Sequence, residues 1–153
     1  DPDGADAYAA NAKDYRTQLE QLDQELRQDL ASIPDQNRVL VSCEGALSYL
    51  AHDYGLEEAY LWPVNAESQI TPKRMARLIE TVRERRVPSI FCESTVSDKA
   101  QREVAAASGA RFAGTFYVDS LSTSDGPAAT LLELQRHNVS LIRQGLASDA
   151  SQR

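Results

Sequence analysis

A short apolar run that ends in a carboxylate and leads directly into a helical pattern occurs three times in the chain. The runs cover residues 38–44, 89–93 and 115–119. In a parallel α/β sheet the carboxyl ends of the strands lie along one edge, and ligands bind in the crevice there. We therefore expect Glu44, Glu93 and Asp119 to share an edge. Three acids close together repel one another unless a cation, a hydrogen-bond donor or a bound proton relieves the repulsion.

Strand-like and helix-like patterns alternate along the whole chain. Steps of three and four between apolar residues from Tyr8 to Leu30 predict a long first helix within residues 1–34, which Pro34 ends. The expected strands cover residues 38–42, 59–62, 89–92 and 111–118; the later helices cover residues 46–54, 71–82, 97–108 and 126–145, before a frayed tail at 147–153. This alternation predicts an α/β fold with a four-stranded parallel sheet flanked by helices on both faces.

Length and charge narrow the possible functions. The chain has 153 residues, which fits one domain with a core of its own. Its net charge is -7, and no Lys/Arg cluster is interleaved with aromatic residues, so we expect no nucleic-acid binding. The first residue is Asp1 rather than Met, and we therefore expect a mature or excised piece of a longer protein.

Two cysteines and two histidines are possible ligands of softer metals. Cys43 and Cys92 each precede a carboxylate at an expected strand end, and the simpler interpretation is two small buried side chains. A disulfide between them would require neighbouring strands, so the sequence leaves their redox state open. His52, near the end of a helix, favours a surface position over metal ligation. His137 also favours a structural role.

The carboxylates indicate a metal site more strongly than the cysteines and histidines do. Glu44 and Asp119 each stand just past an expected strand, where a side chain can point into the crevice. Carboxylate oxygens suit hard divalent cations such as Mn²⁺, Mg²⁺ or Ca²⁺. Each acid could instead cap the following helix, but three acids at equivalent places weaken that alternative. Glu93 could accept backbone hydrogen bonds and support a metal site without touching the metal.

Six motifs follow one another in a fixed order. They are Val-Ser-Cys-Glu-Gly-Ala-Leu-Ser-Tyr-Leu at 41–50, Asp-Tyr-Gly-Leu at 53–56, Thr-Pro at 71–72, Val-Pro-Ser-Ile-Phe-Cys-Glu-Ser at 87–94, Tyr-Val-Asp-Ser-Leu at 117–121 and Arg-His-Asn at 136–138. Together they resemble the carboxyl-terminal lobe of the metal-binding proteins, many of them lipoproteins, that feed bacterial ABC importers of manganese, zinc and iron. The resemblance covers nearly the whole chain.

The resemblance implies a specific site. Proteins of this family have two α/β lobes joined by a long helix, with the metal held between the lobes. Glu44 falls where zinc-type members carry a histidine and manganese-type members a glutamate, and Asp119 falls on the family's carboxylate ligand. Glu93 matches an acid near the site that does not ligate the metal directly. The implied metal is Mn²⁺, with Fe²⁺ and Zn²⁺ as alternatives.

The resemblance also implies that the site is incomplete. The family's two histidine ligands come from the other lobe and the inter-lobe region, neither of which is in this chain. Residues 1–153 would be an isolated carboxyl-terminal lobe with half of a metal site, and the linking helix would end just before Asp1. Two carboxylates alone leave a cation mostly hydrated, so we expect weak binding. The implied partner of the intact protein is an ABC permease, and the implied location is extracytoplasmic, either periplasmic or as a cell-surface lipoprotein.

Two other functions would use the same residues. The three acids could form the rim of an Mg²⁺- or Mn²⁺-dependent hydrolase, but such enzymes usually add a nucleophile or a basic phosphate clamp, and the strand ends have neither. A surface-interaction or adhesin-like module would use Tyr60, Trp62 and the long first helix, and an exposed Trp62 would favour it. We expect a non-enzymatic protein. An isolated lobe would also self-associate through the face it exposes.

Overall fold

Strands and helices alternate in the computed structural model, which describes residues 1–66, 68 and 70–147. The strands are β1 (Val39–Glu44), β2 (Glu57–Trp62), β3 (Ser89–Glu93) and β4 (Arg111–Phe116). The helices are α1 (Ala5–Ala31), α2 (Ser48–Asp53), α3 (Pro72–Glu84), α4 (Lys99–Ser108) and α5 (Leu131–Leu146), with single 3₁₀ turns at η1 (Pro2–Gly4) and η2 (Asp35–Asn37). Each connection between consecutive strands contains a helix, which confirms the predicted α/β class.

The strands form two parallel pairs rather than one continuous ladder of four. β1 pairs with β2, with Val39 opposite Glu57, and β3 pairs with β4, with Ser89 opposite Arg111. Within the described residues no strand ladder joins β1 to β3. The predicted parallel strands are therefore present, but the predicted four-stranded sheet is split at its centre.

Side chains join the two pairs where the ladder is missing. A disulfide links Cys43 on β1 to Cys92 on β3, and the two Cα atoms are 4.8 Å apart. One residue further along, the Glu44 N–H donates to the Glu93 carboxylate (3.2 Å) instead of to a main-chain carbonyl. β1 and β3 therefore lie side by side, held by a covalent bond and a side-chain contact.

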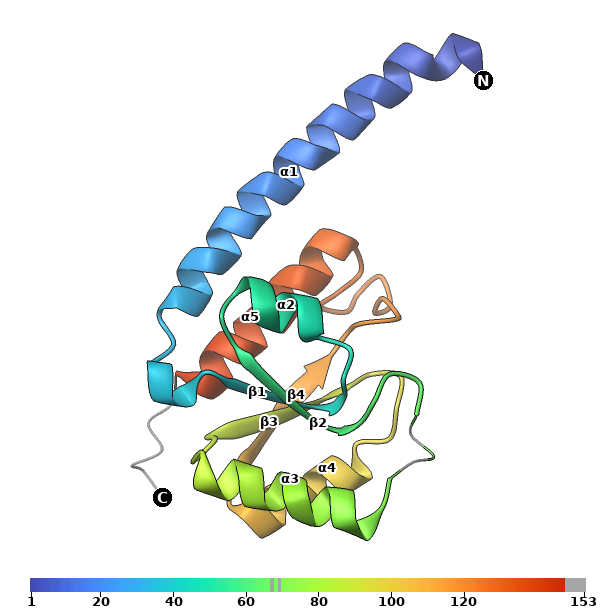
Figure 1. The fold of residues 1–153 in the computed structure, drawn as a ribbon. Coiled ribbons are helices and arrows are strands. Elements are labelled where there is room, and N and C mark those ends of the chain that lie inside the picture. Colours follow the sequence, from blue (N-terminus) through green and yellow to red (C-terminus); the bar gives the residue numbers. More distant parts are fainter. Residues whose placement is uncertain (67, 69, 148–153) are drawn as a thin grey trace.

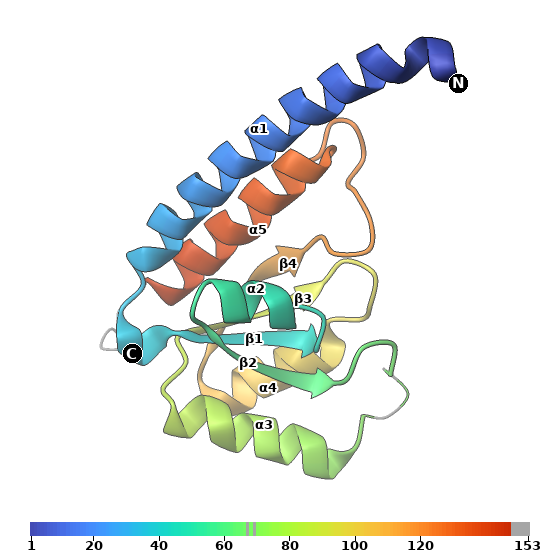
Figure 2. The same cartoon turned by 45° about the horizontal axis from the view of Figure 1, so that its top comes forward.

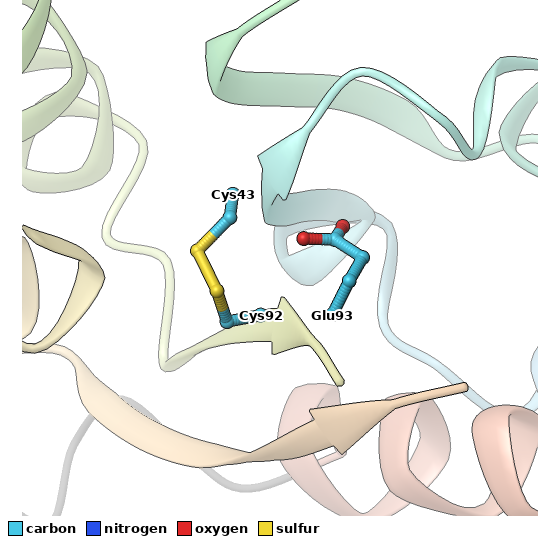
Figure 3. A group of neighbouring side chains, drawn as sticks. All are labelled: Cys43, Cys92 and Glu93. Carbon is cyan, nitrogen blue, oxygen red and sulfur yellow. A yellow bond between two sulfur atoms is a disulfide. The ribbon is translucent and has the colours of Figure 1, made fainter. Parts of the chain in front are cut away.

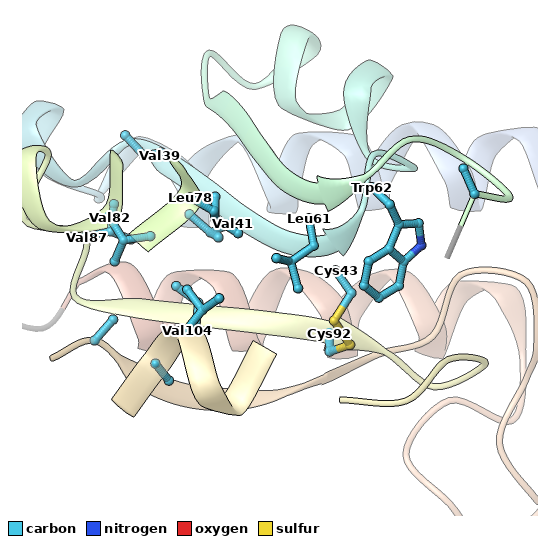
Figure 4. Packing of buried hydrophobic residues seen from close by; sticks show 14 residues of the cluster. Val39, Val41, Cys43, Leu61, Trp62, Leu78, Val82, Val87, Cys92 and Val104 are labelled. Atoms are coloured by element: carbon cyan, nitrogen blue, oxygen red, sulfur yellow. A yellow bond between two sulfur atoms is a disulfide. The ribbon is translucent and has the colours of Figure 1, made fainter. Parts of the chain in front are cut away.

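Each face of the strands carries its own core. Alternate residues point to opposite faces, so Val41 and Cys43 pack under α3 and α4, whereas Leu40 and Phe91 pack under α1 and α5. Figure 2 shows these two helical layers on opposite sides of the strands. The close view in Figure 4 shows the core beneath α3 and α4, including the disulfide. The prediction of helices on both faces is confirmed.

The first helix packs only along its second half. Leu22, Leu26 and Leu30 are buried, whereas Tyr8 is 57% exposed and Tyr15 is 41% exposed. Figure 1 shows the amino-terminal part of α1 standing away from the rest of the chain. The predicted long helix is therefore present, and its regular apolar spacing continues through a first half whose tyrosines are exposed. No described helix is both long enough and apolar enough to cross a membrane.

The predicted boundaries differ most near the strand ends. β1 and β3 continue through their acids, whereas β4 stops at Phe116, before the predicted end at residue 118. The last helix starts at Leu131 instead of near residue 126, because Gly126 lies in a turn and Thr130 provides the helix cap. Of the predicted tail, residues 148–153 lie outside the described part of the chain.

Candidate metal centre

Two of the three predicted acids line one pocket at the carboxyl ends of the strands. Glu44 is the last residue of β1, and Asp119 lies in the loop after β4. The pocket has a volume of about 370 Å³ and is lined by Glu44, Trp62, Asn65, Ser68, Thr95, Val96 and Asp119. The expectation that Glu44 and Asp119 meet at one edge is therefore met, and Asn65 and Thr95 join them there, which the sequence did not predict.

Glu44 is held in this pocket by the loop that follows β2. Its side chain is only 5% exposed, and its carboxylate accepts a hydrogen bond from the backbone N–H of Asn65. Asn65 has a φ of 57°, a left-handed conformation that asparagine adopts more readily than most residues. The left-handed turn at Asn65 was not anticipated from the sequence, although an asparagine shortly after a Trp-Pro strand end is a usable turn signal.

Glu93 lies behind Glu44 rather than in the lining of the pocket. It is 2% exposed, and one carboxylate oxygen accepts the Glu44 N–H while the other has no partner among the described residues. Burial raises the pKa of Glu93 to about 7, backbone N–H groups act in the opposite direction, and the nearby Glu44 adds to the rise. A proton on Glu93 therefore relieves part of the repulsion between the two acids near neutral pH.

None of the three acids caps a helix. The N-cap positions of α2, α4 and α5 are Leu47, Asp98 and Thr130. The capping alternative considered for Glu44, Glu93 and Asp119 is therefore wrong. Of the three, Glu44 and Asp119 present carboxylates to the pocket.

The loop that carries Asp119 is fixed from α5. The Asn138 side chain accepts from the Tyr117 N–H (3.0 Å) and donates to the Tyr117 carbonyl (2.7 Å), so it holds both backbone groups of one residue. His137 lies 3.1 Å from the Thr115 carbonyl, which agrees with the structural role expected for it. Asn138 is 4% exposed; the sequence placed it in the Arg-His-Asn motif at 136–138 but assigned it no role. The sequence feature that could have indicated this role is a polar residue four positions after Leu134, within the buried stripe of α5.

A serine pair joins the two loops at the rim. The hydroxyl groups of Ser94, after β3, and Ser120, after β4, are 3.0 Å apart. The Ser94 N–H also donates to the Phe116 carbonyl at 2.8 Å. The loop that ends in Asp119 is therefore tied to the strand that ends in Glu93.

The histidines do not line the pocket. His52 is exposed on α2, and its Nδ1 atom is 3.1 Å from the carboxylate of its neighbour Asp53. His137 points to the carbonyl of Thr115, as described above. Within the described residues, the ligands that the pocket can offer are therefore oxygen atoms, with carboxylates from Glu44 and Asp119.

A second group of possible metal ligands contains two cysteines that are joined in a disulfide. Ligand atoms of Cys43, Cys92 and Glu93 lie within 4.8 Å of one another, and Figure 3 shows the disulfide with the Glu93 carboxylate beside it. The two sulfur atoms are bonded to each other, so neither is a thiolate that could bind a metal. The question that the sequence left open is thus answered in favour of a disulfide, and both cysteines are also buried, as expected.

The whole of this architecture matches one protein family. Residues 1–145 match the family ZnuA, described as zinc-uptake complex component A, periplasmic. The chain belongs to this family. The resemblance drawn from the motifs is therefore confirmed.

Curated relatives carry different metals in their names. The chain is 45% identical over 145 residues to the iron-binding protein YfeA of Yersinia pestis, covering 95% of this chain and 47% of that protein. It is 32% identical over 147 residues to the manganese-binding lipoprotein MntA of Halalkalibacterium halodurans, covering 96% of this chain and 49% of the relative. The chain spans about half the length of the curated relatives it matches.

Solved structures give the same match in three dimensions. The Mn-bound periplasmic metal binding protein from Candidatus Liberibacter asiaticus superposes with a TM-score of 0.86 and 37% identity, covering 95% of this chain and 54% of that one. The periplasmic zinc binding protein TroA from Treponema pallidum superposes with a TM-score of 0.91 and 26% identity, covering 96% and 55%. A close fold match therefore extends across relatives named for different metals.

Proposed function

We propose that this chain supplies half of a site that captures a divalent metal ion for an ABC importer. Glu44 and Asp119 would be the two ligands, and the metal would be cargo rather than a resident cofactor. The observation that carries the proposal is the joint position of both carboxylates in one pocket, in a chain of this family. The names of the relatives, which are metal-binding and periplasmic or lipoprotein components, support the same function and an extracytoplasmic location.

The residues of the pocket fit a hard divalent cation. Carboxylates from Glu44 and Asp119 can supply charged oxygen ligands, which Mn²⁺ accepts well. Glu93 contributes a buried oxygen without a partner behind Glu44, and it can orient that ligand through the Glu44 backbone. We propose Mn²⁺ as the favoured ion, with Fe²⁺ and Zn²⁺ as alternatives, because oxygen ligands discriminate less in favour of zinc than imidazole does.

Residues 1–153 would form one lobe of a two-lobe protein. The exposed tyrosines of α1 and the 90% exposed Tyr49 on α2 are apolar surface that a second lobe could cover. That lobe would add the remaining ligands, and the complete protein would deliver its ion to a permease in the membrane. Alone, the chain would bind the ion weakly, because two carboxylates leave most of its coordination to water.

Titration calorimetry with Mn²⁺ and Zn²⁺ tests the proposal on this chain and on the two-lobe protein. Tight binding is expected only in the two-lobe protein, and Glu44→Gln or Asp119→Asn should each weaken it strongly. Glu84→Gln, an exposed acid on α3, is the matched control and should leave the affinity unchanged. Sub-micromolar binding of Mn²⁺ by this chain alone would refute the half-site, as would full affinity in either site variant.

The alternative functions have less support. Trp62 is fully buried, which removes the exposed aromatic that an adhesin-like surface would have used. The family is described as a component of a zinc-uptake complex, which supports a transport role rather than hydrolysis.

A further inference from the structure

We propose that the groove between β2 and α3 is a docking site for an extended acidic peptide segment, which would add as a strand to the open edge of β2. This inference is separate from the metal site and does not depend on it. The groove has a volume of about 570 Å³ and is lined by four consecutive residues of β2 and by one side of α3. Figure 2 shows β2 as the outer strand, with α3 along its side.

β2 has a free edge. It pairs with β1 on one side, and within the described residues no strand lies on its other side. An edge strand carries backbone N–H and C=O groups that can pair with an added strand. Peptide recognition by strand addition uses such an edge for affinity and the neighbouring side chains for specificity.

The helix beside this edge is the most basic part of an acidic protein. Residues 72–86 hold six of the 16 Lys and Arg residues but only two acids, although the net charge of the chain is -7. Lys73, Arg74 and Arg77 line the groove and are exposed. None of these three side chains forms an ion pair with a described residue. The groove therefore presents cations that lack counter-charges, next to unpaired backbone.

The acids of β2 do not neutralise these cations. Glu58 accepts hydrogen bonds from the Leu47 N–H (3.0 Å) and the Ser48 hydroxyl (2.6 Å), so its carboxylate is committed to the start of α2. Glu57 forms an ion pair with Arg85 at 2.6 Å, and neither residue lines the groove. That pair joins the first residue of β2 to the C-cap residue of α3 and leaves Lys73, Arg74 and Arg77 without an acid from β2.

These features define the partner. In an added strand, alternate side chains would face α3, and the other side chains would face the opposite side of the sheet, near Tyr60. Acidic residues at alternate positions would then meet Lys73, Arg74 and Arg77. The expected ligand is therefore an extended segment with Asp or Glu at every second position, rather than a compact anion.

Fluorescence anisotropy with a labelled peptide of alternating Asp and Val tests the proposal on the 153-residue chain at low salt. The double variant Arg74→Glu/Arg77→Glu should weaken binding at least about tenfold, because two partly exposed ion pairs are lost and replaced by repulsion. The control Lys13→Glu/Arg16→Glu changes the net charge equally on an exposed part of α1. It should bind like the wild type. Circular dichroism verifies that both double variants are folded.

The peptide itself supplies the control for strand addition. The same peptide, N-methylated at every second residue along one edge, should bind at least about tenfold more weakly, because it cannot pair with β2. A peptide of alternating Lys and Val should not bind. Equal binding of the methylated and unmodified peptides, or equal loss in the two double variants, would overturn the proposal.

A membrane surface is the competing partner for a basic helix. Sedimentation of the chain with vesicles of phosphatidylglycerol and phosphatidylcholine measures its binding to an anionic membrane surface. Binding to vesicles that depends on Arg74 and Arg77, without binding to the acidic peptide, would overturn the proposal in favour of a lipid surface. Peptide binding that anionic vesicles do not reproduce would support it.

Discussion

Glu93 makes the stability of the chain depend on pH. Its folded pKa of about 7 lies above the ordinary value of 4.5, because burial disfavours the charged form. A raised acid pKa gives stability that is complete below pH 4.5 and is lost as the pH rises through 7. The loss amounts to roughly 3 kcal/mol, from 1.36 kcal/mol per pKa unit.

Glu93→Gln should therefore remove this pH dependence. The amide keeps an oxygen that can accept the Glu44 N–H but has no charge to bury. With divalent metals chelated, the variant should equal the wild type at pH 4 and exceed it by roughly 3 kcal/mol at pH 8. Urea unfolding at both pH values measures the difference. Glu84→Gln is the exposed control. An equal difference in stability between Glu93→Gln and the wild type at both pH values would contradict the raised pKa of Glu93.

Asn138 is the residue that positions the Asp119 loop. Asn138→Ala leaves the backbone N–H and C=O of Tyr117 without their partners, and should lower the free energy of unfolding by about 2–3 kcal/mol. It should also weaken metal binding by the two-lobe protein, since Asp119 lies two residues after Tyr117. Asn138→Asp can still accept from the N–H but sets a buried carboxylate oxygen against the Tyr117 carbonyl, so it should not recover the lost stability at neutral pH. Unchanged stability in Asn138→Ala would show that the two hydrogen bonds between Asn138 and Tyr117 do not stabilise the loop.

At the scale of the elements, the disulfide connects β1 and β3 in place of a backbone hydrogen-bond ladder. It closes a loop with a sequence separation of 49 residues and links two strands that share no backbone ladder in the described residues. Cys43→Ser/Cys92→Ser should lower the free energy of unfolding by roughly 2–4 kcal/mol. Denaturant unfolding of this variant, beside wild type with and without reductant, measures the effect. Equal stability of all three would show that the bridge contributes nothing to the junction.

The two halves of α1 should respond differently to the same kind of truncation. Leu26 is 5% exposed and belongs to the core, so Leu26→Ala should cost about 2–4 kcal/mol of unfolding free energy. Tyr15 is 41% exposed on the free half, so Tyr15→Ala should cost at most about 0.5 kcal/mol. Thermal unfolding of the two variants provides the comparison. A large cost for Tyr15→Ala would mean that the first half of the helix is packed in solution.

Much of this architecture could be read from the sequence, and the failures have physical causes. Alternating strand and helix patterns predicted the α/β class, and the run ending in Glu44 predicted one side of the pocket. Tyr8 and Tyr15 continue the helical spacing, but spacing alone cannot tell whether anything packs against a helix. The prediction of one continuous sheet failed because β1 and β3 are joined by side chains instead of by a backbone ladder. No local sequence pattern reveals that difference. Asn65 donates its backbone N–H to the distant Glu44 carboxylate, and Asn138 holds the backbone of the distant Tyr117, so both roles emerged only in the folded chain.

At the scale of the whole molecule, one apolar hollow is left open. It has a volume of about 420 Å³ and lies where α1, α2 and α5 meet, with residues such as Leu19, Leu22, Leu47, Leu50 and Leu134 in its lining. At its margin Tyr49 is 90% exposed and Leu131 is 45% exposed. Exposed apolar surface that gathers around a hollow favours association, since burying it removes water from apolar area.

We therefore expect this chain to self-associate when it is alone and the proposed two-lobe protein to remain monomeric. Light scattering over a range of concentrations measures both. Tyr49→Ser/Leu131→Ser should shift the isolated chain towards monomer, because both side chains border the hollow. Tyr60→Ser is the control: it is also a partly exposed aromatic, but it lies on β2, away from this hollow and beside the basic groove. A monomer at high concentration would refute self-association, and a shift caused by Tyr60→Ser alone would move the contact to the β2 edge.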